Sequence, residues 1–147
     1  MPKTARCTAE IIVGLPPDRA MSLFTAEGER EWAGDGWDPH YPASERRDGP
    51  GAVFTTEHGH RTTWVMVDHH AEGVRYARVT EGVSAGTVAV DLVAADANTT
   101  RVRVTYDLTA LSAAGEHHLE AFEAGYDAEI ASWADQIARA LDRRAPA

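Results

Sequence analysis

The chain has 147 residues and a formal net charge of -9 at pH 7. Its hydrophobic fraction of 44% and charged fraction of 25% are those of an ordinary soluble globular protein, and they argue against disorder and against a membrane span. The negative charge disfavours nucleic acid and anionic membrane surfaces as partners, because both attract basic proteins. We therefore expect one domain, residues 1–147, that binds no nucleic acid and does not insert into a membrane.

The sequence contains one cysteine, Cys7, which cannot form a disulfide bond within the chain. The first residues also lack the charged and then apolar pattern of a secretory signal segment. We therefore expect a cytoplasmic protein in a reducing compartment, present as a monomer or a homodimer.

The N-terminal part of the chain predicts one strand followed by two short helices. Residues 7–15 alternate weakly and carry β-branched side chains, which favours a strand. Pro16 and Pro17 end this strand, and proline is tolerated in the first turn of a helix because its missing N–H would be unpaired there. The first short helix presents Met21, Leu23 and Phe24, and the second ends near Trp32.

Residues 33–51 predict a long loop, because glycine, proline and charged residues dominate there. This loop also holds Trp37, His40 and Tyr41, an unusual aromatic content for a connection.

After Gly51 the pattern changes to short segments rich in valine, threonine and tyrosine, separated by turn residues. Short links between consecutive strands indicate antiparallel neighbours, because a parallel pair needs a crossover of a dozen or more residues. In the last segment, alternate residues are apolar and polar, so one face of the sheet is covered and the other is solvated. The expected strands are 52–57, 61–69, 73–81, 87–95 and 99–110.

Residues 112–144 predict a long C-terminal helix, because large apolar residues recur there at steps of three or four. A helix of this length is about 45 Å long, so its apolar face needs a broad sheet as partner. The order of elements therefore predicts an α+β fold in which the sheet and this helix pack together. The apolar face comprises Leu119, Phe122, Tyr126, Ile130, Trp133, Ile137 and Leu141.

Several motifs together resemble the SRPBCC superfamily, which includes the birch-pollen allergen, the START lipid-transfer domains and the polyketide cyclase/dehydrase-like proteins. The resemblance covers nearly the whole chain. It implies a helix-grip fold, in which a strongly curved antiparallel sheet wraps around the long C-terminal helix and encloses an apolar cavity. The motifs are Pro16-Pro17, Trp32 with Trp37-Asp38-Pro39, residues 51–54, 63–68 and 75–80, and residues 110–115 before the aromatic-rich helix.

A long helix against a curved sheet leaves a hollow that suits an apolar ligand unless bulky side chains fill it. Gly125 removes one side chain from the helix, which leaves room for a ligand or for a close backbone approach. On strand 61–69 the inward set is either Trp64 and Met66 or the equally apolar alternate set of Thr63, Val65 and Val67. The candidate ligand-binding residues are Phe54, Trp64, Met66, Tyr76, Tyr106, Phe122, Tyr126, Ile130 and Trp133.

The sequence offers two weak candidates for acid–base catalysis, His40 in the aromatic loop and Asp68 at the end of an apolar strand. We expect no metal site, because the pair His58 and His60 flanks a glycine of a hairpin turn and has no third ligand at a motif spacing. No cofactor motif is present. Residues 82–86 match G-x-S-x-G, but they lie between two antiparallel strands and not between a strand and a helix, so we interpret them as a turn.

These observations favour a protein that binds a small hydrophobic molecule, such as a lipid, a polyketide or another aromatic or isoprenoid metabolite. An alternative is an enzyme of the polyketide aromatase/cyclase type acting in the same cavity. Cyclisation requires proton transfer, and few titratable residues fall on the predicted inward faces, so the sequence favours binding. A second alternative is a protein–protein module like the chaperone activators, which predicts a filled cavity and an exposed apolar patch.

Overall fold

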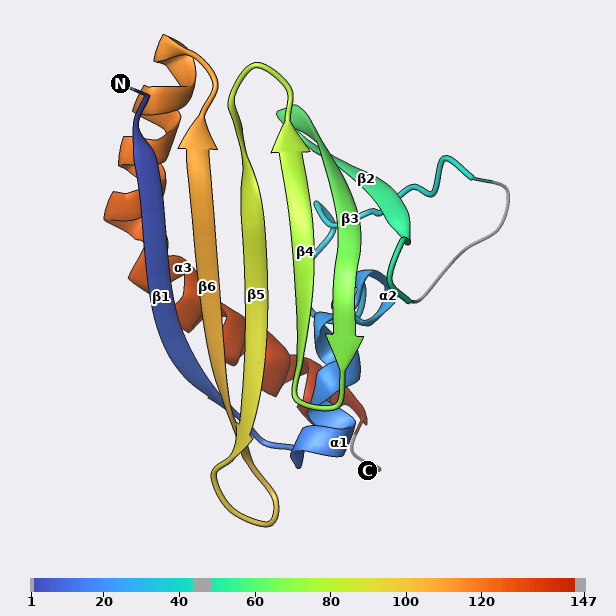
Figure 1. Ribbon diagram of the computed structural model, residues 1–147. Coiled ribbons are helices and arrows are strands. Elements are labelled where there is room, and N and C mark those ends of the chain that lie inside the picture. The colour runs from blue at the N-terminus through green and yellow to red at the C-terminus, as the bar shows by residue number, and fades with distance from the viewer. Residues whose placement is uncertain (1, 44–48, 145–147) are drawn as a thin grey trace.

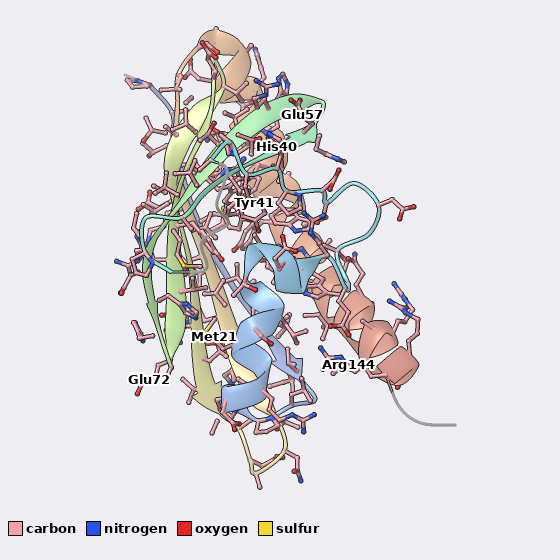
Figure 2. The ribbon with its side chains drawn as sticks, turned by 90° about the vertical axis from the view of Figure 1, so that its right-hand side faces the viewer. Met21, His40, Tyr41, Glu57, Glu72 and Arg144 are labelled. Atoms are coloured by element: carbon pink, nitrogen blue, oxygen red, sulfur yellow. The ribbon has the colours of Figure 1, made fainter. Side chains whose placement is uncertain are left out.

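The computed structural model describes residues 2–43 and 49–144. It contains one curved antiparallel sheet with the long helix α3 across one face, and Figure 1 shows this helix passing diagonally behind the strands. Viewed from the side in Figure 2, the sheet and α3 form two layers, and the short N-terminal helices lie between them at one end. The elements are β1 Thr4–Val13, α1 Pro17–Ala20, η1 Met21–Phe24, α2 Ala26–Glu29, β2 Val53–His58, β3 His60–His70, β4 Gly73–Thr80, β5 Ser84–Ala94, β6 Thr100–Ala110 and α3 Ala113–Arg144.

The strand order is β1-β6-β5-β4-β3-β2, and every neighbouring pair is antiparallel. The meander after Gly51 and the α+β class are therefore confirmed. Two predicted strand boundaries are wrong by three residues. β1 begins at Thr4, because residues 4–6 pair with β6, and β5 begins at Ser84, which pairs with both Thr80 and Ala110. Pairing across the sheet, which local propensity does not report, sets these ends.

The segment between β1 and β2 folds into three single turns of helix. Proline occupies the first turn of α1, as predicted, and the chain continues as a 3-10 turn, η1. The Thr25 hydroxyl then caps α2 by accepting a hydrogen bond from the Gly28 N–H at 3.1 Å. The indole N–H of Trp32 donates to the Leu23 carbonyl at 2.8 Å. This bond ties the end of the segment back to η1.

Helix α3 matches the predicted span, and its apolar face lies against the sheet. Leu119, Tyr126, Ile130 and Ile137 are buried, whereas Phe122, Trp133 and Leu141 are partly buried. The first turn is fixed by Ser112, whose hydroxyl donates to the Gly82 carbonyl and accepts from the Gly115 N–H. Within the described ranges, no helix combines the length and the apolar character needed to cross a membrane.

Gly82 and Val83 lie in the turn between β4 and β5, whereas residues 84–86 already belong to β5, so the prediction that all five residues form a turn is only partly right. Because both flanking elements are strands, the G-x-S-x-G match has no strand-to-helix context. Ser84 is 2% exposed and is the first residue of β5, not an exposed nucleophile.

Thr100 gives a direct test of how the chain that leaves β1 is held to the sheet. Its hydroxyl donates to the Leu15 carbonyl at 2.7 Å, and the side chain is fully buried. We expect Thr100→Val to lower the free energy of unfolding by about 1 to 3 kcal/mol, because the carbonyl is left without its donor. Urea unfolding followed by circular dichroism measures the change, and a variant as stable as the wild type would contradict this role.

Candidate ligand-binding cavity

A cavity of about 650 Å³ lies between the concave face of the sheet and α3. This volume falls within the usual range of small-molecule sites. The walls come from β2, β3, β4, β5 and β6, from α3, from η1 and α2, and from the start of the loop after α2. The structure therefore contains the hollow that the resemblance implies.

All four tryptophans of the chain line this cavity. Trp37 donates its indole N–H to the Ala26 carbonyl at 2.8 Å, and Trp64 donates to the Thr56 hydroxyl at 3.0 Å. Trp32 packs on Trp133 with ring centroids 5.4 Å apart. Because the polar atoms of Trp32, Trp37 and Trp64 are already bonded to the protein, these rings offer mainly apolar surface to the cavity.

Seven of the nine predicted ligand-binding residues line the cavity, and Phe54 and Met66 do not. Phe54 is 2% exposed, with its ring stacked on Trp64 and Trp37 packed edge-on against it. Met66 is 3% exposed and pairs with Tyr76, whose hydroxyl reaches the Phe24 carbonyl, so η1 covers this end of the strands. The seven lining residues are Trp64, Tyr76, Tyr106, Phe122, Tyr126, Ile130 and Trp133.

The structure also settles which face of β3 turns inward. Trp64 and Met66 are buried together with Thr62, whereas Val67 of the alternate set is 46% exposed. On α3, Gly125 lines the cavity, and a Cβ atom at this position would meet no atom within 4 Å. The structure therefore favours the interpretation that Gly125 leaves room for a ligand, and not that it allows a close backbone approach.

His40 and Asp68, the candidates for acid–base catalysis, do not line the cavity. The backbone of His40 pairs with Thr55, and its side chain is exposed. Asp68 follows an irregularity in the pairing of β3 with β4, and its carboxylate lies 3.6 Å from His70 on the outer surface. Residues 44–48 of the loop that carries His40 lie outside the described residues.

Arg78 is a cavity residue that the sequence analysis missed. Its guanidinium lies over the rings of Trp64 and Tyr106, 4.9 Å and 5.7 Å from their centroids. One terminal nitrogen donates to the Thr80 hydroxyl at 3.2 Å, and the buried Nε has no hydrogen-bond partner in the described chain. Desolvation lowers the pKa of this group. Tyr76, Arg78 and Thr80 alternate along β4, so the period of two already places Arg78 inward.

Glu29, at the end of α2, brings a carboxyl group to the cavity. Desolvation raises the pKa of this carboxyl to about 8, and none of the described residues hydrogen-bonds to it. At pH 7 the group is therefore mostly protonated. No sequence pattern could have identified it, because a helix of four residues is too short to show a periodicity.

Tyr106 differs from the other tyrosines that line the cavity. Tyr76 and Tyr126 donate their hydroxyls to the carbonyls of Phe24 and Val104, whereas the Tyr106 hydroxyl has no partner among the described residues. Burial raises the pKa of Tyr106 to about 12, although nearby Arg78 opposes this shift. The hydroxyl thus stays protonated and free to bind a ligand.

Three histidines, His58, His60 and His118, stand at the exposed edge of the cavity. The rings of His60 and His118 lie edge to face with centroids 6.3 Å apart. Across residues 2–43 and 49–144, no group of three or more His, Cys, Asp or Glu side chains could hold a metal ion.

No family model and no curated protein sequence matches the chain. Solved structures do match it. The Zhui aromatase/cyclase from Streptomyces sp. R1128 superposes with a TM-score of 0.70 at 15% identity, over 97% of each chain. Norcoclaurine synthase from Thalictrum flavum, in complex with dopamine and hydroxybenzaldehyde, gives 0.67 at 10% identity over 99% of this chain and 91% of its own.

The Mll3558 protein from Rhizobium loti gives a TM-score of 0.65 at 20% identity, over 92% of this chain and 99% of that one. Identities this low establish the fold alone. The chain therefore has the helix-grip fold that its motifs predict.

Proposed function

We propose that the protein binds a small, largely aromatic hydrophobic molecule in the cavity between the sheet and α3. The observation that carries this proposal is the convergence of all four tryptophans on one cavity of about 650 Å³. The indole N–H groups of Trp32, Trp37 and Trp64 already donate to protein atoms. Their flat rings therefore remain to stack with an aromatic ligand. The solved structures with this fold include one crystallised with dopamine and hydroxybenzaldehyde, both aromatic.

Native mass spectrometry of the purified protein, compared with its denatured mass, tests this proposal. We expect an adduct that leaves on denaturation, and we expect a neutral apolar dye, N-phenyl-1-naphthylamine, to quench tryptophan fluorescence as it binds. A bare mass together with no response to the dye would refute the proposal.

Gly125 provides a variant that narrows the cavity without disturbing the fold. No atom lies within 4 Å of a Cβ at this cavity-lining position. We therefore expect a leucine there to occupy part of the cavity, and Gly125→Leu to weaken dye binding about tenfold while the protein stays folded. The neighbouring Ala124 is exposed and does not line the cavity, so Ala124→Leu is the matched control. Equal affinities in the two variants would place the dye elsewhere.

A second candidate function is an enzyme of the aromatase/cyclase type. Two titratable groups that the sequence analysis did not place inward, Glu29 and Arg78, line the cavity together with Tyr106. A carboxyl group with a pKa near 8 is suited to proton transfer at neutral pH. Incubation with a linear poly-β-ketone, followed by mass spectrometry of the products, tests this candidate. Cyclised product that falls at least about a hundredfold in Glu29→Gln would support it.

The protein–protein module receives less support. It predicts a filled cavity, whereas the sheet and α3 enclose an open volume of about 650 Å³.

A further inference from the structure

Arg78 has an unusual place for an arginine. It lies at the centre of the sheet, where β4 pairs it with Trp64 of β3 and Gly86 of β5. Its side chain lines the cavity, and its guanidinium lies over the rings of Trp64 and Tyr106. Arginine presents five N–H donors in a fixed planar fork. Within the described chain, Arg78 donates a single side-chain hydrogen bond, to the Thr80 hydroxyl.

The charge of Arg78 also lacks a counter-ion. No Asp or Glu of the described residues lies within 4.0 Å of its guanidinium. Glu29 and Glu129 line the same cavity but neither pairs with Arg78, and the carboxyl of Glu29 is mostly protonated at pH 7. A desolvated cation without a partner is unfavourable, and the contacts with Trp64 and Tyr106 offset only part of this cost.

Three threonine hydroxyls of the cavity lie near Arg78. The hydroxyls of Thr62 and Thr80 bond to each other at 2.7 Å, and Thr56 lies beside them on β2, toward the histidine edge. Phe24, Trp32, Ile130 and Trp133 supply a broad apolar wall, and Glu29, Glu129 and Gln136 also line the cavity. The cavity thus combines a desolvated cation with an extensive aromatic surface, which matches an amphipathic molecule.

We propose that the ligand is an organic anion whose carboxylate, or a comparable oxyanion, pairs with the free donors of Arg78 while its aromatic body lies along the tryptophan walls. This inference rests on the proposed function and specifies its ligand class. The net charge of -9 repels anions from the protein as a whole. A preference for an anion therefore requires a local cation, and Arg78 supplies it.

Two dyes with the same ring skeleton test the inference. 8-Anilino-1-naphthalenesulfonate carries a sulfonate, and N-phenyl-1-naphthylamine lacks it. We expect the wild type to bind the sulfonate about tenfold more tightly or better, since charge-assisted hydrogen bonds to a desolvated arginine favour it. Arg78→Met should bind the two dyes equally. Arg75→Met is the matched control, because Arg75 lies on the outer face of the same strand, and it should keep the wild-type preference.

Each outcome is informative. If neither dye binds the wild type and its native mass is bare, the proposed function fails. If both bind but the wild type shows no preference, or if folded Arg78→Met keeps the preference or loses both dyes, this inference fails and cavity binding stands. If Arg78→Met does not fold, the dye preference of the wild type is measured at 0.5 M NaCl instead. An enclosed ion pair keeps the preference there, whereas attraction to surface charges would be screened and the preference lost.

Discussion

Gly115→Ala is expected to lower the free energy of unfolding by about 3 kcal/mol or more, as measured by urea titration with circular dichroism. A Cβ at this position would lie 2.0 Å from the Val83 carbonyl oxygen, a distance at which one backbone must move. Neither can move easily. Gly115 lies in the first turn of α3, and the turn that contains Val83 is already bonded to this turn through Ser112. The substitution therefore disturbs the contact between the first turn of α3 and the turn before β5.

Gly125→Ala, on the same helix, is the matched control. No atom lies within 4 Å of a Cβ at Gly125, so the gain in helix propensity is not opposed and should raise stability by about 1 kcal/mol. The two substitutions make the same chemical change and are expected to have opposite signs. If both variants were stabilised, the close approach of α3 to the turn before β5 would be wrong.

The fold could be predicted because the sequence patterns of its helix and strands extend over many residues. The 32-residue helix α3 repeats its apolar period many times, and the strands of the meander alternate over eight residues or more apart from the shorter β2. Short turns then leave only antiparallel neighbours. Strand ends were less accurate, because Thr4 and Ser84 are strand residues only through their partners on β6 and β4.

The candidate site could be predicted in part. The aromatic residues of α3, β4 and β6 lie on faces that periodicity defines, and these do line the cavity. Phe54 also lies on a predicted inward face, but Trp37 from the irregular loop covers it, and no sequence pattern reports such a contact. Arg78 was overlooked for a different reason. Its alternation with Tyr76 placed it inward, but an arginine is rarely buried without a partner.

Glu29→Gln is expected to remove a pH dependence of stability that the wild type shows between about pH 5 and pH 8. The pKa of the Glu29 carboxyl is raised from 4.5 to about 8 in the folded protein, so the folded state binds more protons than the unfolded state in this interval. Stability then falls as the pH rises, by up to about 1.4 kcal/mol per pH unit. Above the folded pKa, both states are ionised and the slope from this group ends.

Two tyrosines of the cavity, Tyr76 and Tyr106, feel the charge of Glu29. Burial raises the pKa of Tyr76, and that of Tyr106 to about 12, so both hydroxyls stay neutral. Denaturant titrations at pH 5, 6, 7 and 8 should therefore show Glu29→Gln gaining on the wild type by at most about 4 kcal/mol across the series. The exposed Glu81 offers the control Glu81→Gln, which should follow the wild type. Parallel curves for Glu29→Gln and the wild type would mean that water reaches this carboxyl freely, and the acid–base role of Glu29 would lose its physical basis.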